Sequence, residues 1–283
     1  MIKLIADSTC DLDQELATKY DVSILPLHVV LGEDEYIDGV NISPDMIYKW
    51  SALNDDTPKT SAPSIVDAIK MFEPIINNGD EIIAFSISKE ISSSGNVMLL
   101  AAEELDATDK IKIIDSRSLC YGISLLVIKA RQLIDKGCSL DEIYETISNM
   151  TCNISASFIV DELTYLHRGG RCSSIAAMAS SVIKLHPVID LVDGKLISGS
   201  KYRGKMNKVI DTYVIEKMPE IVNKGCDMAI VAYTGDLEEV CLSIKDNIIN
   251  EHVFDNVLLL KAGSVIASHC GPNTFGLFYI TRD

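Results

Sequence analysis

The sequence lacks long apolar runs and is poor in positive charge, and each of these absences excludes a class of protein. No stretch approaches the roughly 18 apolar residues that a membrane-spanning helix requires, and the apolar start is interrupted by Asp7, too early for a secretion signal. The formal net charge of −16 argues against binding to nucleic acid, which needs clustered Lys and Arg, and to anionic membranes. We therefore expect a soluble, cytoplasmic protein that binds no nucleic acid and has no stable membrane insertion.

Motifs for metals, nucleotides and serine hydrolases are also missing. The eight cysteines contain no CxxC or CxxxC pair, which is typical of small buried side chains in a reducing compartment. The five histidines show no spacing for a metal site, and the chain has neither GxxxxGK nor GxGxxG to hold nucleotide phosphates. No GxSxG nucleophile elbow occurs. We expect no metal and no cofactor.

The composition and its patterning predict a two-domain α/β protein. The 283 residues, 47% of them hydrophobic, favour two domains, with one large α/β domain as the alternative. In residues 1–152, β-type runs alternate with helical segments, which predicts a three-layer α/β/α domain with a mostly parallel sheet. Residues 153–283 mix crossovers with hairpins, the clearest at Asp193-Gly194, and predict an α+β domain with a mixed sheet.

The individual elements follow from the same periodicities. In the first half we expect strands at 2–7, 22–30, 81–88 and 110–115, a polar excursion at 34–39, and helices at 11–20, 43–53, 64–76, 95–105, 119–136 and 139–151. In the second half we expect strands at 153–160, 186–192, 195–202, 227–235, 256–262 and 264–271, and helices at 175–185, 205–222 and 237–250. On this interpretation His269 ends the last strand.

The segment TSAPS, from Thr60 to Ser64, has more hydroxyl groups than a helix start needs. Ser64 followed by Asp67 has the spacing of a capping box, and Ser61 is an alternative cap, with Pro63 in the first turn. Neither interpretation uses Thr60. Its hydroxyl is therefore a candidate ligand-binding group.

A second hydroxyl-rich stretch, SISKEISSSGN, follows an apolar strand. It carries Ser92, Ser93 and further serines just before a helix. In an open parallel sheet, ligands bind beyond the carboxyl ends of the strands, where loops and helix N-termini present donors. DSTCDL, after the first strand, lies on the same edge. Ordinary turn and cap chemistry could explain each loop alone.

Neutral donors favour one kind of ligand. Hydroxyl and amide groups can hold a carboxylate through charge-assisted hydrogen bonds without an ion pair. A triphosphate would normally require the glycine-rich loop and lysine that this chain lacks. The sequence therefore favours a site for a small monovalent anion.

Charged and titratable candidates lie mainly in the second half. His269, in SVIASHCGPNTFG, is a possible donor or base, with a structural role as the alternative. The strand interpretation places Cys270 on the opposite face, which argues against a Cys–His pair. YLHRGGRCSS contains Arg171, and KYRGKMNK contains Arg203 and Lys205; these groups could contact an anionic partner or simply be solvated.

Taken together, these motifs resemble the DegV family of bacterial fatty-acid-binding proteins. The similar segments span the chain in order: DSTCDL, TSAPS, SISKEISSSGN, IIDSRSLCYG, YLHRGGRCSS, RGK and SHCGPNTFG. The serine loop departs from the family pattern SSGLSGTYQ, because Lys89 and Glu90 replace small residues and Ser93 stands where glycine is usual. Order and spacing across nearly the whole chain make this resemblance more specific than any single motif.

The resemblance implies a lipid carrier, not an enzyme acting alone. The protein would bind one long-chain fatty acid, palmitate- or oleate-like, with its tail in an apolar tunnel between the domains. Thr60 and Ser92 would bind the carboxylate, with Ser93 or Ser61 as backbone or hydroxyl helpers and His269 as a further donor; the changed loop leaves Ser93 as the alternative to Ser92. Some members present the lipid to an ATP-dependent fatty acid kinase that forms an acyl phosphate for phospholipid synthesis. Arg171, and with it Arg203 and Lys205, would face that kinase or its nucleotide phosphates.

Two other classes of function remain open from sequence. One is a small-molecule phosphotransferase or hydrolase that uses His269 and the serine loops, which would turn over substrate without a partner. The other is a sugar- or nucleotide-binding module, which polar compounds would stabilise and fatty acids would not.

Overall fold

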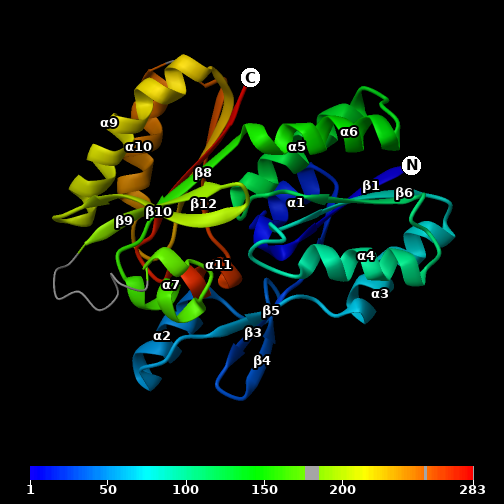
Figure 1. Ribbon diagram of the computed structural model, residues 1–283, viewed down its shortest axis with the longest axis horizontal. Coiled ribbons are helices and arrows are strands. Elements are labelled where there is room, and N and C mark those ends of the chain that lie inside the picture. The colour runs from blue at the N-terminus through cyan, green and yellow to red at the C-terminus, as the bar shows by residue number, and fades with distance from the viewer. Residues whose placement is uncertain (176–184, 252–253, 283) are drawn as a thin grey trace.

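The first sheet confirms the predicted α/β/α arrangement. The chain is described here by a computed structural model that covers residues 1–175, 185–251 and 254–282 (Figure 1). Four parallel strands lie in the order β2-β1-β6-β7, with α5 and α6 on one face and α3 and α4 on the other (Figure 1). The strands are Val22–Leu25 (β2), Ile2–Asp7 (β1), Glu81–Ser86 (β6) and Ile111–Asp115 (β7). The helices are Ile65–Asn77 (α3), Ser94–Glu104 (α4), Tyr121–Asp135 (α5) and Leu140–Met150 (α6).

The second sheet is mixed, also as predicted. Its order is β10-β9-β8-β13-β11-β12, in which only β11 and β12 pair in parallel. The strands are His186–Val192 (β9), Lys195–Tyr202 (β10), Ile154–Ile159 (β8), Phe275–Thr281 (β13), Cys226–Tyr233 (β11) and Asn256–Lys261 (β12). Met206–Lys224 (α9) and Glu238–Asn250 (α10) pack on one face. Asp193 and Gly194 both have positive φ and form the predicted hairpin turn between β9 and β10.

A third, small sheet was not predicted. Asp34–Ile37 (β4), His28–Leu31 (β3) and Lys59–Ser61 (β5) form it in antiparallel order β4-β3-β5, beside Pro44–Asn54 (α2). The expected single strand at 22–30 was wrong, because Pro26 has no N–H to continue a ladder and the chain changes sheets there. Leu27 N instead donates to Ser8 Oγ at 3.0 Å.

Two short helices were not predicted from the sequence. Residues 264–271 were expected to be a strand, but Ser264–Cys270 form a helix (α11), and the last strand follows it as β13. No helix or strand was predicted at YLHRGG, but Leu163–Gly169 form a helix (α7) that packs against α11. A 3-10 turn, Ser8–Cys10, and the helix Gln14–Lys19 (α1) follow β1. The predicted helix at 175–185 lies almost wholly outside the described residues.

Helix α5 joins the two large sheets. It packs on β1 and β6 of the first sheet and on β8, β11 and β13 of the second, and its residues from Tyr121 to Ile128 are all buried. One apolar core therefore runs from the first sheet across α5 to the second. The domain division near residue 153 stays a prediction. Within the described residues, no helix has the length and apolar character to cross a bilayer.

Candidate functional site

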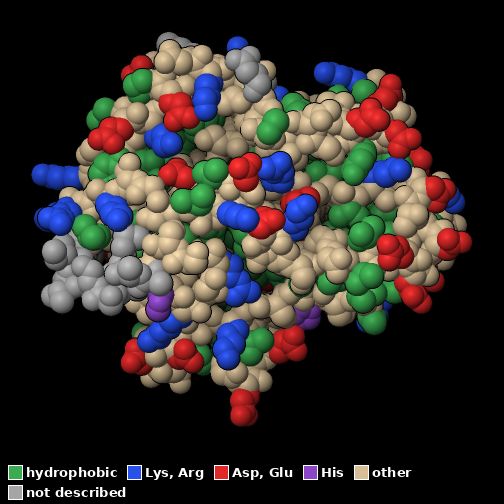
Figure 2. All heavy atoms as spheres, in the orientation of Figure 1, with side chains coloured by type: hydrophobic (Ala, Val, Ile, Leu, Met, Phe, Trp, Pro, Cys, Tyr) green, Lys and Arg blue, Asp and Glu red, His purple; other side chains and the backbone are tan. Residues whose placement is uncertain are grey.

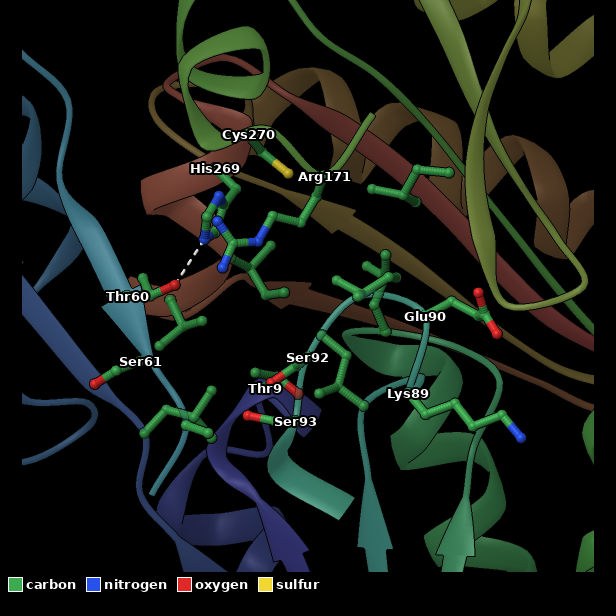
Figure 3. Close-up of a pocket in the computed structure, with 18 of the residues that line it drawn as sticks. Thr9, Thr60, Ser61, Lys89, Glu90, Ser92, Ser93, Arg171, His269 and Cys270 are labelled. Carbon is green, nitrogen blue, oxygen red and sulfur yellow. Dashed lines mark hydrogen bonds between the residues drawn. The ribbon is translucent and has the colours of Figure 1, made fainter. Parts of the chain in front are cut away.

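A cavity of about 480 Å³ lies where the serine loop, β5, α11 and the second sheet meet (Figure 3). This volume lies within the roughly 300–1,000 Å³ range of small-molecule sites. Its polar and charged lining residues are Thr9, Thr60, Ser61, Lys89, Glu90, Ser92, Ser93, Arg171 and His269. Its apolar lining residues include Leu27, Ile87, Ile91, Leu119, Phe158, Leu166, Leu196, Val265 and Ile266. The site therefore has one hydroxyl-rich region and a larger apolar surface.

Thr60 and His269, which are 209 positions apart in the sequence, are in contact in the fold. Thr60 sits in β5, opposite Val29 of β3, and its Oγ1 lies 2.8 Å from His269 Nε2 (Figure 3). The His269 ring fits because Gly169, at the end of α7, has no side chain: a Cβ there would lie 2.4 Å from Nδ1. The sequence motifs indicated Thr60 and His269 as site residues; Gly169 lies within the motif YLHRGGRCSS, but no role was predicted for it.

His269 is neutral at physiological pH. Burial of the ring, and secondarily the nearby Arg171 guanidinium, lower the pKa of His269 from 6.5 to about 4. Its Nδ1 is buried and has no hydrogen-bond partner. When the proton is on Nε2, the ring donates to Thr60 Oγ1, and the Thr60 hydroxyl must then donate to another acceptor. A carboxylate in the cavity would provide that acceptor.

The serine loop adds donors at the start of α4. Ser92 Oγ accepts from Ser94 N at 3.3 Å, so its own proton is available to the cavity. Ser93 is the N-cap residue of α4 but makes no side-chain capping bond, and like Ser92 it lines the cavity (Figure 3). The unpaired N–H groups and the dipole of a helix N-terminus favour a negative ligand. Both serines can therefore take part in anion binding.

Ser61 and Ser64 contribute differently from Thr60. Ser64 Oγ accepts from Asp67 N at 3.1 Å, and Asp67 Oδ2 accepts from Ser64 N at 3.2 Å, which is the predicted capping box of α3. Ser61 is in β5 and is not a cap. It lines the cavity, but its hydroxyl points away from Thr60, as alternation along a strand requires (Figure 3).

The predicted basic residues separate into two groups. Arg171 lines the cavity, and its Nη1 donates to Gly169 O at 2.6 Å, with the guanidinium beside the His269 ring (Figure 3). Arg203 and Lys205 do not line the cavity. They are exposed on either side of Gly204, whose carbonyl lies 3.1 Å from His186 Nε2.

Behind the hydroxyls, a buried carboxylate fixes the loop after β1. Asp7 accepts from Thr9 N at 3.2 Å, from Thr9 Oγ1 and from Ile87 N at 2.9 Å, and burial raises its pKa. These bonds hold Thr9 in the cavity wall and tie β1 to the end of β6. Asp7 is the first residue of the motif DSTCDL, but the sequence alone did not predict that its carboxylate holds this loop in place.

The tip of the β9–β10 hairpin closes over the serine loop. Ser88 Oγ donates to Gly194 O at 2.8 Å, Lys195 Nζ lies 3.4 Å from Glu90, and Arg117 lies 2.7 Å from Asp193. Figure 2 shows acidic and basic side chains interspersed in the middle of the face that it draws. We call these six residues the clasp. It joins the two large sheets directly beside the cavity.

Catalytic and metal chemistry find little support in this geometry. His269 Nδ1 lacks the carboxylate that would orient it in a nucleophile–base–acid triad. Cys270 follows His269 in a helix, and burial raises the pKa of its thiol to about 12. In the described part of the chain, no three His, Cys, Asp or Glu side chains are grouped so as to hold a metal ion.

Comparison with known proteins finds relatives that match nearly the whole chain. The family model described as "Uncharacterised protein, DegV family" matches residues 1–282. A DegV domain-containing protein of Clostridium perfringens is 31% identical over 99% of this chain and 98% of its own length.

Solved structures extend the comparison to the fold. One described as showing fatty acid binding of a DegV family protein from Thermus thermophilus has a TM-score of 0.90 and 26% identity, covering 99% of both chains. A stearic-acid-binding protein from Eubacterium ventriosum has a TM-score of 0.85 and 28% identity, covering 100% of this chain and 99% of its own. From the family match and the C. perfringens relative, we conclude that this chain belongs to the DegV family.

Proposed function

We propose that the protein binds one long-chain fatty acid, such as palmitate or oleate, and acts as a carrier. The carboxylate is held by Thr60 and by Ser92 or Ser93, with Ser61 nearby and His269 behind Thr60. The observation that carries this proposal is the Thr60–His269 contact of 2.8 Å at the hydroxyl-rich part of a cavity whose lining is otherwise mainly apolar. The fatty acids bound by structurally similar proteins support it.

The donor set suits a carboxylate that must remain reactive. Thr60 and the two serines are neutral, and His269 stays neutral because burial lowers its pKa to about 4. Hydrogen bonds from neutral donors orient the carboxylate without the strong ion pair that a lysine would form. Arg171 also lines the cavity, and its guanidinium donates to Gly169 O at 2.6 Å.

The tail supplies most of the binding free energy. Each buried methylene contributes about 0.8 kcal/mol, so a chain of roughly sixteen carbons gains on the order of 10 kcal/mol before losses. Ordering and translational losses remove part of this gain, yet tight binding remains. The hydroxyl groups therefore mainly fix the orientation of the ligand.

A matched pair of variants tests the site. Thr60→Val removes a charge-assisted hydrogen bond worth roughly 1.5–3 kcal/mol and should weaken oleate binding about 10- to 100-fold. Ser64→Ala, four residues away, removes only the α3 cap and should lower the unfolding free energy by about 1 kcal/mol while leaving oleate affinity unchanged. Titration calorimetry and thermal unfolding measure both effects. Equal oleate affinity in wild type and Thr60→Val would exclude this carboxylate site.

We further propose that the protein presents the lipid to an ATP-dependent fatty acid kinase, which forms the acyl phosphate used in phospholipid synthesis. In this role Arg171, Arg203 and Lys205 face the kinase or its nucleotide phosphates. Arg203 and Lys205 are exposed and lie outside the cavity lining. The double variant Arg203→Glu, Lys205→Glu should keep wild-type oleate affinity but lose acyl phosphate formation with a bacterial fatty acid kinase. Unchanged acyl phosphate formation would contradict the proposed interface.

The alternative function, a phosphotransferase or hydrolase using His269, makes a different prediction. Turnover of phosphate esters or acyl esters by the protein alone, abolished in His269→Gln, would support it. The unpartnered Nδ1 of His269 favours the carrier role.

A further inference from the structure

A second, smaller cavity adjoins the first. Its volume is about 20 Å³, and it shares four lining residues with the larger cavity: Leu119, Phe158, Ile266 and Cys270. The hydroxyl-rich group of Thr60, Ser92 and Ser93 lines only the larger cavity. The small cavity therefore continues the apolar part of the site.

The register of the second sheet explains why space exists at this position. Gly276 of β13 lies directly opposite Phe158 of β8 on one side and Ala232 of β11 on the other. These three residues form one row across the face that α5 covers, and all three line the small cavity. Two neighbouring positions without a long side chain leave room on this face; the Phe278 ring covers the part over Gly276, and Phe158, Ala232 and Phe278 all line the small cavity that is left.

Gly276 cannot be replaced without changing this small cavity. A Cβ at this position would lie 2.8 Å from Phe278 Cε2 and 3.5 Å from the Cβ of Ala232. Glycine weakens a strand interior, and its presence there often marks a close approach by another group. Here the glycine lets the Phe278 ring lie close to the strand. The ring packs edge-on against Tyr121, with the two ring centroids 5.9 Å apart.

The small cavity presents an apolar surface although two threonines line it. Thr234 Oγ1 donates to Gly271 O at 2.7 Å, and Thr274 Oγ1 donates to Cys270 O at 2.9 Å. Both hydroxyl protons are therefore used by backbone carbonyls. A methyl or methylene group fits this surface, whereas a polar group would find no free donor from these two residues.

We propose that the small cavity beside Ala232, lined also by Phe158 and Phe278, receives the end of the acyl tail and sets the longest tail that binds well. This inference rests on the proposed fatty acid function and adds the residues that determine chain length. Ala232 is the critical position, because added carbons there project into the space that the last methylenes occupy.

The test compares laurate and stearate binding to the delipidated full-length protein. Ala232→Leu should lower stearate affinity at least about tenfold while changing laurate affinity less than about twofold, because each excluded methylene costs about fourfold. Ala232→Val, which adds less volume, should shift the ratio in the same direction by a smaller factor. Displacement of a fluorescent fatty acid gives both affinities, and the retained laurate affinity reports an intact fold.

Ile230→Val is the matched control. Ile230 lies two residues from Ala232 on β11 and belongs to the same core, but it lines neither cavity. It should leave the stearate-to-laurate ratio unchanged. If the two Ala232 variants also leave the ratio unchanged while wild type binds both acids, this inference is overturned and the proposed function stands. Wild-type protein that binds neither acid overturns the proposed function, and this inference with it.

Discussion

The proton on the His269 ring determines what the Thr60 hydroxyl can do. With the proton on Nε2, the ring donates to Thr60 Oγ1, 2.8 Å away, and the hydroxyl proton is then free for the carboxylate that we propose. A protonated, cationic His269 is disfavoured by burial and by Arg171. The side chain therefore keeps one charge state through the physiological pH range.

The lowered pKa of His269 predicts a pH dependence of stability. In the unfolded chain His269 takes up a proton below about pH 6.5, whereas the folded protein resists protonation until about pH 4. The unfolded state thus binds more protons between these values, and stability falls as pH decreases from 6.5 to 4. At 1.36 kcal/mol per pKa unit, the full effect is roughly 3 kcal/mol.

His269→Gln is the variant that isolates this effect, since it keeps a polar side chain but does not titrate. Urea unfolding of delipidated protein at several pH values should show a smaller loss of stability in the variant than in wild type between pH 6.5 and 4. Parallel curves for the two proteins would contradict the lowered pKa.

Single residues were predictable where a motif marked them. Thr60, Ser92, Ser93 and His269 were all indicated by hydroxyl-rich or family-like segments, and all line one cavity. The role of Gly169 was not predicted, because this glycine leaves room for the His269 ring, which is 100 positions away in the sequence. Contacts of that kind depend on the packing of α7 against α11, which local sequence does not encode.

At the scale of elements, the β9–β10 hairpin is the part that closes the site. Its tip is held by one buried hydrogen bond, from Ser88 Oγ to Gly194 O, and by two exposed ion pairs. Exposed ion pairs contribute only about 0–1 kcal/mol each. The buried hydrogen bond is therefore the main contact of the clasp.

Ser88→Ala should loosen the clasp. It leaves the Gly194 carbonyl without its partner, at a cost of roughly 1–3 kcal/mol, and we expect the bound fatty acid to dissociate severalfold faster. Arg117→Gln, which removes only the exposed pair with Asp193, is the control and should leave the dissociation rate close to wild type. Stopped-flow transfer of oleate to lipid vesicles measures the rate. A wild-type rate in Ser88→Ala would argue that the hairpin does not gate the cavity.

The wrongly predicted elements have physical explanations. Six of the seven residues of α11 are buried, so the segment has no polar face and no helical periodicity to detect. The small sheet β4-β3-β5 consists of strands of only three or four residues, each stabilised by partners elsewhere in the chain. By contrast, α3 carries its own start signal in Ser64 and Asp67, and the β9–β10 turn carries Asp193-Gly194, so both were predicted correctly.

At the scale of the whole molecule, the two large sheets share α5 and one apolar core. The overall class, a parallel sheet followed by a mixed one, was predictable because alternating strands and helices have a clear sequence pattern. The position of the cavity between them was not readable from periodicity, since it depends on how the sheets face each other. It was expected from the family resemblance alone.

The central claim is that this cavity holds a long-chain fatty acid. Native mass spectrometry of the full-length protein, purified from bacteria and then delipidated and mixed with oleate or palmitate, tests it most directly. We predict a mass increase equal to one fatty acid in the purified protein, its loss on delipidation, and its return with either acid. Protein that carries no fatty acid when purified, and takes up neither oleate nor palmitate, would contradict the claim.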